Sequence, residues 1–244
     1  PSIVPFNCSG AISEIKALVN NGYQEVVLTG IHTGNYGVDL DTNFAHLLKE
    51  LIKIKGLKRL RISSIEATEL TDEVLEVIKE SNVIVDHLHI PLQAGSDEIL
   101  KAMNRKYDLA YFFKKIEEIR KIRPNISITT DVIVGFPGET RELFEKTIKT
   151  CRELEFAKIH VFPYSERKGT KAIELPNHVD PSEKKSRARE LLLVSKELEI
   201  AYAEKFIGKT EEVLIEENKD DYSLGHTSNY LHVKIPRTIK PNTF

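Results

Sequence analysis

A run of β-branched and apolar residues ends in a turn rich in glycine and proline at Thr129-Thr130-Asp131-Val132-Ile133-Val134-Gly135-Phe136-Pro137-Gly138-Glu139-Thr140. The run is typical of a buried strand in a parallel sheet, and residues 141–154 continue it with a helical pattern. The two glycines permit a sharp turn that exposes main-chain groups at the carboxyl end of the strand, where α/β folds bind ligands. Such turns also occur for structural reasons alone, so the rest of the chain has to distinguish the two interpretations.

Four more short apolar segments are each followed by a polar cluster. The expected strands cover residues 25–28, 58–62, 85–90 and 158–161, and the clusters cover residues 29–37, 63–66, 91–96 and 162–167. Because the carboxyl ends of parallel strands lie at one edge of a sheet or barrel, this repetition favours one shared site over five coincidences.

Helical patterns lie between these strands. Residues 11–21, 43–55, 71–81 and 109–123 carry apolar residues on one face, and the first two patterns stop at Gly22 and Gly56. Strand and helix alternate roughly every 30 to 40 residues, which is the spacing of repeated βα units. The sequence therefore predicts an α/β fold with a parallel sheet.

The last part of the chain has a different pattern. After an apolar helix at residues 191–202, Ile207-Gly208-Lys209 interrupts the periodicity, and alternating strands are expected at residues 212–216 and 230–235, joined by a polar, charged loop. We therefore expect a main domain at residues 1–206 and a small β unit at residues 207–244. This unit is short for a barrel, so it leans on the main domain or is incomplete.

Composition limits the class of protein. The 244 residues are 41% hydrophobic and 30% charged, which predicts a soluble globular protein with one large domain and an appendage. No apolar run approaches the roughly 18 residues of a membrane span, and the first residues are not a signal peptide, so no membrane partner is expected. Two cysteines, Cys8 and Cys151, exclude a disulfide scaffold and fit a cytoplasmic protein.

Five segments together resemble the radical S-adenosylmethionine (SAM) methylthiotransferases. They are residues 28–37 (LTGIHTGNYG), 61–66 (RISSIE), 87–96 (HLHIPLQAGS), 131–139 (DVIVGFPGE) and 160–165 (HVFPYS). The resemblance runs from about Ile3 to about Pro236, and is strongest to the enzymes that act on N6-threonylcarbamoyladenosine in tRNA. It implies a transferase that adds a methylthio group to C2 of this base next to the anticodon. Alternatives are the isopentenyladenosine tRNA enzyme, the ribosomal-protein enzyme and a cluster-less RNA-binding relative.

The resemblance also implies the architecture, cofactors and partners. The fold would be a partial, six-stranded β/α barrel of the TIM-like radical SAM type, followed by an all-β TRAM domain at residues 207–244 that helps to bind tRNA. The cofactors would be SAM, a [4Fe–4S] cluster, and a second [4Fe–4S] cluster in an N-terminal domain that this sequence lacks. The partners would be the tRNA anticodon stem-loop and a reducing protein such as flavodoxin or ferredoxin.

Site residues follow from the same resemblance. Contacts to SAM are expected from Gly30, Ser63, Ser64, Glu66, His89, Gln93, Val134, Gly135 and Tyr164. Gly30 would lie near the methionine part of SAM, and the backbone at Val134 and Gly135 near its adenine. Contacts to the substrate are expected from Arg167 and from His32, for which a structural role is the alternative.

A basic run at Lys184-Lys185-Ser186-Arg187-Ala188-Arg189 is the local candidate for tRNA contacts, since the net charge of −2 gives no global nucleic-acid signature. Lys184 and Arg187 are the expected phosphate contacts, and a solvated helix face is the alternative.

The sequence departs from the family at the cluster ligands. The family holds its cluster with Cys-x3-Cys-x2-Cys directly before an Ile-Val-Pro-aromatic stretch. Here Ser2 occupies the last cysteine position before Ile3-Val4-Pro5-Phe6, and Cys8 lies six residues beyond it. Serine is a poor cluster ligand compared with a thiolate. We therefore expect no metal ligand in this chain, and an inactive fragment of a longer enzyme rather than a naturally cluster-free homologue.

Overall fold

The computed structural model describes residues 8–30, 32–38 and 40–244. The chain forms two compact units. The first unit contains the described residues up to 88, residues 121–127 and the residues from 210 onward. The second unit contains residues 89–120 and 128–209. The expected division into a main domain at residues 1–206 and a small β unit at residues 207–244 therefore stays a prediction.

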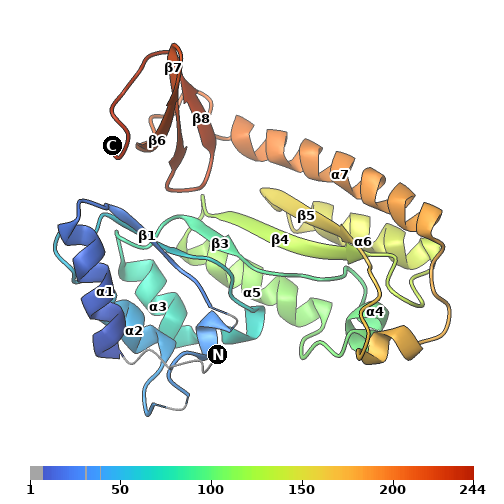
Figure 1. The fold of residues 1–244 in the computed structure, drawn as a ribbon. Coiled ribbons are helices and arrows are strands. Elements are labelled where there is room, and N and C mark those ends of the chain that lie inside the picture. The colour runs from blue at the N-terminus through green and yellow to red at the C-terminus, as the bar shows by residue number, and fades with distance from the viewer. Residues whose placement is uncertain (1–7, 31, 39) are drawn as a thin grey trace. The chain divides into compact units, whose positions relative to one another are not determined.

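The first unit is built on a parallel pair of strands, β1 (Glu25–Leu28) and β2 (Arg59–Ile62), as Figure 1 shows. Its helices are α1 (Cys8–Asn20), α2 (Phe44–Leu51) and α3 (Asp72–Glu80). Short 3₁₀ helices lie at Thr33–Asn35 and Ala67–Glu69. Helices α2 and α3 begin where the side chains of Asn43 and Thr71 accept hydrogen bonds from the free amides of the first turn.

Strand β2 is buried on both faces, with four consecutive buried residues in the sequence Arg-Leu-Arg-Ile. Successive side chains of a strand point to opposite faces, so Leu60 and Ile62 share one face and Arg59 and Arg61 share the other. The arginine face requires polar partners, because an unpaired charge is costly to bury.

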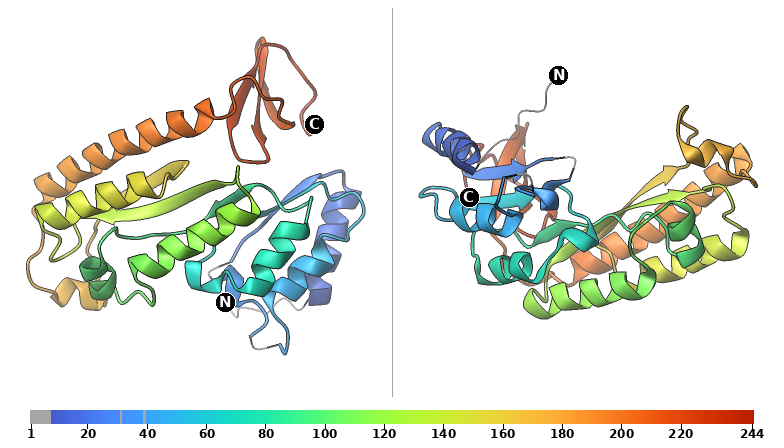
Figure 2. Two further views of the ribbon diagram at one scale, coloured as in Figure 1. Left: turned by 180° about the vertical axis from the view of Figure 1, so that it is seen from behind. Right: turned by 90° about the horizontal axis from the view of Figure 1, so that it is seen from below.

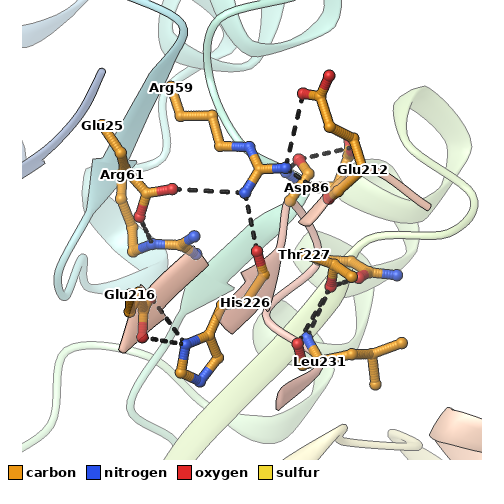
Figure 3. Close-up of polar contacts among 11 residues, drawn as sticks. Glu25, Arg59, Arg61, Asp86, Glu212, Glu216, His226, Thr227 and Leu231 are labelled. Atoms are coloured by element: carbon orange, nitrogen blue, oxygen red, sulfur yellow. Dashed lines mark hydrogen bonds and ion pairs between the residues drawn. The ribbon is translucent and has the colours of Figure 1, made fainter. Parts of the chain in front are cut away.

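The C-terminal segment supplies partners for these arginines (Figure 3). Nη1 of Arg59 donates to the carbonyl oxygen of His226 at 3.0 Å, and Nη2 donates to that of Glu212 at 2.6 Å. The guanidinium of Arg61 lies 4.5 Å from the ring centroid of Tyr230, and its Nε donates to Glu25 at 3.0 Å. These contacts attach the C-terminal segment to β2.

That segment is an antiparallel sheet of β6 (Val213–Lys219), β7 (Tyr222–Thr227) and β8 (His232–Ile235), in this order. The expectation that a polar loop joins two strands was wrong, because β7 lies within that segment. The buried face of β7 consists of Ser223, Gly225 and Thr227, which are small and mostly polar. The usual alternation of large apolar and polar residues is therefore weak in this strand.

The second unit contains the parallel pair β4 (Ser127–Val134) and β5 (Lys158–Pro163), in a sheet of order β3-β4-β5. The short strand β3 (His87–His89) lies where the chain passes between the units. The helices are α4 (Asp97–Ala102), α5 (Leu109–Ile122), α6 (Arg141–Glu153) and α7 (Pro181–Glu204), with a 3₁₀ helix at Lys171–Glu174. Helix α7 runs alongside α6 and β5 in both views (Figures 1 and 2).

The α/β expectation is confirmed, because all five expected strands are present and β1–β2 and β4–β5 pair in parallel. Helix α7 begins at Pro181 after the cap Asp180, so the basic run lies within its first turns, ahead of the apolar part at residues 191–202. Among the described helices, none has both the length and the apolar composition that crossing a bilayer requires.

Candidate functional site

In the first unit, the polar segments after β1 and β2 begin side by side. The backbone amide of Ser63 donates to the carbonyl oxygen of Leu28 at 3.0 Å, which continues the ladder of the two strands by one residue. Gly30, Ser63 and Ser64 therefore follow neighbouring strands at the same sheet edge. This is the position at which α/β folds place ligand-binding residues.

Glu69 is a residue of this edge that the sequence analysis missed. Its side chain is only 6% exposed, and its Oε2 accepts from the backbone amides of Glu66 at 3.1 Å and Gly34 at 3.3 Å. Nδ1 of His32 lies 3.5 Å from Oε1 of Glu69, while the His32 side chain is 64% exposed. The Glu69 carboxylate thus holds the loop after β1 against the loop after β2.

Glu66 has a local structural contact in the same segment. It is the N-cap of the 3₁₀ helix Ala67–Glu69, and the two carboxylates form a reciprocal capping box. A second acidic residue three positions later is the sequence signal that could have identified Glu69.

Gly30 and His32 also line a cavity of about 490 Å³ between α1, β1 and α2. Its wall is largely apolar and includes Ile15, Leu18 and Phe44. Ser63, Ser64 and Glu66 are not among its lining residues. The structure therefore places the five predicted residues of this unit in two neighbouring groups.

In the second unit, three of the predicted residues line one pocket of about 470 Å³. Gln93, Tyr164 and Arg167 contribute to its wall. The sequence analysis did not assign its other lining residues, which are Asp131, Ile133, Phe136, Phe162, Pro163, Ser165, Thr170 and Ala172. A wall of aromatic rings with a few polar groups is typical of sites for small organic ligands.

Gln93 is held in an unusual backbone conformation at this pocket, with φ of 69°. The backbone amide of Gln93 donates to the backbone carbonyl oxygen of Asp131 at 2.8 Å. The backbone carbonyl oxygen of Gln93 accepts from the backbone amide of Ile133 at 2.9 Å. A left-handed conformation at a residue other than glycine requires such support from its neighbours. The β4 backbone thus fixes the direction of the Gln93 side chain.

Tyr164 follows β5, and its amide donates to the carbonyl oxygen of Val134 at 2.8 Å. Its ring packs edge-to-face against Phe136 with centroids 5.1 Å apart, and Nζ of Lys184 lies 5.0 Å from its centroid. The hydroxyl is buried and has no hydrogen-bond partner among the described residues. Burial also raises the pKa of Tyr164, and Glu166 adds to this effect, so the hydroxyl keeps its proton and can donate to a ligand.

Val134 and Gly135 are predicted residues that do not line this pocket. The Val134 side chain is fully buried, and the Gly135 amide donates to Oε2 of Glu139 at 2.6 Å. Gly135 has φ of 72°, and a Cβ atom there would lie 2.5 Å from Cγ of Lys184. Within this structure, the space beside Gly135 is therefore filled by a lysine side chain.

His89 belongs to a polar cluster beside the pocket. Its Nδ1 lies 2.9 Å from the hydroxyl of Thr129, and its Nε2 lies 3.3 Å from Oδ1 of Asp131. The ring centroids of His89 and His160 are 5.6 Å apart. Burial lowers the pKa of His160 and the neighbouring His89 contributes in the same direction, so the neutral imidazole is favoured.

The basic run on α7 is not uniformly exposed. Arg187 is buried, with its Nε 2.9 Å from Glu183 and its Nη1 2.8 Å from Glu139. Lys185 and Arg189 are exposed, and Lys184 is half-buried. The ion pairs account for Arg187 without a ligand, and its predicted phosphate contact has no support in this geometry.

The described residues do not fit a [4Fe–4S] cluster. Within residues 8–30, 32–38 and 40–244, no group of three histidine, cysteine or acidic side chains is placed to hold a metal ion. Cys8 begins α1, whereas Cys151 is fully buried in α6 of the other unit. The predicted departure at Ser2 and the segment Ile3-Val4-Pro5-Phe6 lie outside the described residues.

The pocket of the second unit does fit part of SAM. Its Gln93 and Tyr164 end offers a buried hydroxyl without a partner, a side-chain amide and the rings of Phe136 and Tyr164, which suit an adenosyl group. Parallel strands whose carboxyl ends carry such groups define an α/β ligand-binding domain of the kind found in enzymes.

Comparisons with known proteins agree with this class. The sequence profile of the Radical SAM superfamily matches residues 11–151. The structure is similar to coproporphyrinogen III oxidase (HemN) from Escherichia coli, described as a radical SAM enzyme, with a TM-score of 0.59 and 16% identity. That likeness covers 81% of this chain and 47% of the other, and at this identity it concerns the fold alone.

Sequence relatives narrow the family. The chain is 45% identical to the threonylcarbamoyladenosine tRNA methylthiotransferase MtaB of Bacillus subtilis, over 91% of this chain and 51% of the relative. It is 41% identical to the tRNA-2-methylthio-N(6)-dimethylallyladenosine synthase of Desulfitobacterium hafniense, over 92% and 52%. The chain belongs to the radical SAM superfamily and, within it, to the methylthiotransferase family. The assignment made from the sequence motifs is confirmed, although the chain spans only about half the length of the curated relatives it matches.

Proposed function

We propose that this chain is the SAM-binding core of a tRNA methylthiotransferase that modifies C2 of N6-threonylcarbamoyladenosine next to the anticodon. The observation that carries the proposal is the 45% identity to a relative named for this nucleoside. The 41% identity to a relative named for dimethylallyladenosine makes that nucleoside the second candidate.

The parallel strands of the two units are proposed to belong to one partial, six-stranded barrel, of which five strands are described. The antiparallel sheet β6-β7-β8 is proposed to be the TRAM domain that the sequence predicts at residues 207–244. Its attachment to β2 through Arg59 fits the expectation that this short unit leans on a larger one.

SAM is proposed to contact Gln93 and Tyr164 in the second unit, and Gly30, Ser63 and Ser64 at the strand ends of the first. When bound, SAM supplies the methyl group that a methylthio product carries. Tyr164 would donate its buried hydroxyl to the ligand, and Gln93 would orient it through its amide. Glu69 would keep the loop after β1 in place, since its carboxylate already joins the two loops.

The family implies a [4Fe–4S] cluster, and the described residues do not supply its ligands. The cluster ligands, the second cluster, the tRNA anticodon stem-loop and a flavodoxin or ferredoxin partner are therefore proposed for the full-length protein.

The test is to express the full-length gene in bacteria that lack both tRNA methylthiotransferases, and to analyse digested tRNA by mass spectrometry. Appearance of 2-methylthio-N6-threonylcarbamoyladenosine supports the proposal, whereas the dimethylallyl product alone would replace it with the second candidate. A protein that binds tRNA but forms neither product would be the cluster-less RNA-binding relative.

A further inference from the structure

One face of the β4–β5 pair carries an aromatic ring beside polar groups. In the parallel register, Asp131 lies next to His160 and Ile133 lies next to Phe162. Ile159, directly before His160, is buried on the opposite face, and its backbone amide donates to the hydroxyl of Ser195 on α7. Phe162 remains 50% exposed, which is unusual for a phenylalanine of a sheet.

The polar groups of this face form a connected chain. Thr129 contacts one nitrogen of His89, and the other nitrogen contacts Oδ1 of Asp131, whose side chain stays 31% exposed. The His160 ring lies beside His89, and the His160 side chain is exposed. Asp131 is therefore oriented by an imidazole while part of its carboxylate remains open to a ligand.

Asp131 and Phe162 also line the 470 Å³ pocket, so the face and the pocket are continuous. An exposed aromatic ring offers a stacking surface for a nucleobase, and such stacking does not depend on which base is bound. A carboxylate accepts hydrogen bonds from N–H groups, and a neutral imidazole can donate one and accept one. These groups suit a flat heterocycle that carries polar substituents.

We infer that this face seats the target adenosine of the RNA, with its base on Phe162 and its N6 substituent bonded by Asp131 and His160. This inference rests on the proposed function and adds the residues that select the substrate. SAM would occupy the Gln93 and Tyr164 end of the same pocket.

The polarity of the face distinguishes between the two candidate substrates. A threonylcarbamoyl group has N–H and hydroxyl groups that can donate to Asp131, and a carboxylate that can accept from the His160 imidazole. A dimethylallyl group is apolar and would give no hydrogen bond to the open carboxylate oxygen of Asp131 or to His160. Sites built for polar substituents reject analogues that lack them, because buried polar groups are then left unpaired.

The test measures binding of fluorescent anticodon stem-loops to the full-length protein, without cluster reconstitution and without turnover. One loop carries N6-threonylcarbamoyladenosine, the second carries N6-dimethylallyladenosine and the third carries adenosine. The variants are His160→Phe, His160→Gln, Asp131→Asn and Phe162→Leu. Leu193→Ala on α7 is the matched control, because Leu193 is exposed at 67% and is not among the pocket residues. Thermal unfolding of each variant reports whether it folds.

His160→Phe is expected to raise Kd for the threonylcarbamoyl loop about tenfold, the equivalent of one hydrogen bond, and to change Kd for the other two loops less than about twofold. His160→Gln keeps a donor and should restore most of the difference. Phe162→Leu should weaken all three loops alike, while the control changes none. SAM affinity, measured by calorimetry, should stay the same in all variants.

Equal losses for the three loops in His160→Phe, or unchanged binding in both His160→Phe and Asp131→Asn, would overturn the inference. Loss of SAM affinity in these variants would assign the face to the cofactor instead. If the wild-type enzyme forms the threonylcarbamoyl product and the variants still select their loop normally, only this inference fails. If the wild type does not form that product, the proposed function fails with it.

Discussion

Arg187 and Glu139 form a buried ion pair, in which Nη1 of Arg187 lies 2.8 Å from Oε2 of Glu139 and the side chains are 6% and 0% exposed. The same Oε2 accepts from the amide of Gly135, and Nη1 of Arg187 also donates to the carbonyl oxygen of Glu139. Burial raises the pKa of Glu139, while the bonds from Arg187 and Gly135 act in the opposite direction. The pair thus fixes the turn after β4 to helix α7.

Arg187→Met should lower the free energy of unfolding by about 3 kcal/mol, because it leaves a buried carboxylate without its partner. Arg189→Met is the control, since Arg189 is exposed on the same helix, and should change it by less than about 0.5 kcal/mol. Denaturant titration gives both values. The double variant Glu139→Gln with Arg187→Met should recover part of the loss, and equal stability of the two single arginine variants would contradict the structural role.

Gly135→Ala and Gly138→Ala form a matched pair. Both glycines have positive φ, so each alanine costs about 1 kcal/mol from the backbone. The added Cβ meets Lys184 at position 135, whereas nothing lies within 4 Å at position 138. Gly135→Ala should therefore be the less stable variant, and adding Lys184→Ala should remove the difference. If the two single variants remain equally stable, the contact with Lys184 is not a tight one.

The turn that contains these glycines shows what the sequence could predict. The β-branched run and the helix after it determine β4, the turn and α6, because local propensity and burial agree there. The strand ends that carry Gln93 and Tyr164 were also predicted, since they follow apolar runs. Their convergence on one pocket follows from the parallel pairing of the strands.

Other features depend on contacts that are distant in the sequence. Arg59 and Arg61 give no sign in the sequence that they are buried, because their partners lie about 150 to 170 residues further along the chain. Strand β7 was missed because its buried face lacks large apolar residues. Arg187 was assigned to RNA because a basic run does not show which of its members faces inward.

Arg59→Met should release the C-terminal sheet from β2. The substitution removes the hydrogen bonds to the backbone carbonyl oxygens of His226 and Glu212. It also removes one of the two ion pairs that Glu25 forms with arginines. We expect faster cleavage by trypsin at Lys209 and a loss of about 2 kcal/mol or more in stability. Lys53→Met is the control, because Lys53 is exposed and its ion pair is with the nearby Glu50 near the end of α2. Equal cleavage rates in the two variants would show that Arg59 does not anchor the sheet.

This chain, reconstituted anaerobically with iron and sulfide, should bind no [4Fe–4S] cluster. Cys151 is buried, its pKa is raised by burial to about 12, and Cys8 alone cannot hold a cluster. A thiol reagent should modify one cysteine in the folded chain and two after denaturation. Chemical analysis that finds about four irons per chain would refute this prediction.

The proposed function predicts that the exposed part of the basic run contacts RNA phosphates. Lys185 and Arg189 are exposed on α7, whereas Arg187 is held by Glu139 and Glu183. Each lost phosphate contact flattens the plot of log K against log salt by about 0.7 to 0.9. Lys185→Gln with Arg189→Gln should therefore reduce the slope by up to about 1.8 in full-length protein, measured with unmodified tRNA at several salt concentrations. Lys196→Gln, at an exposed position further along α7, should leave it unchanged. A reduction of the same size in the Lys196 variant would indicate a general charge effect, and identical slopes in all proteins would assign this face of α7 to solvent.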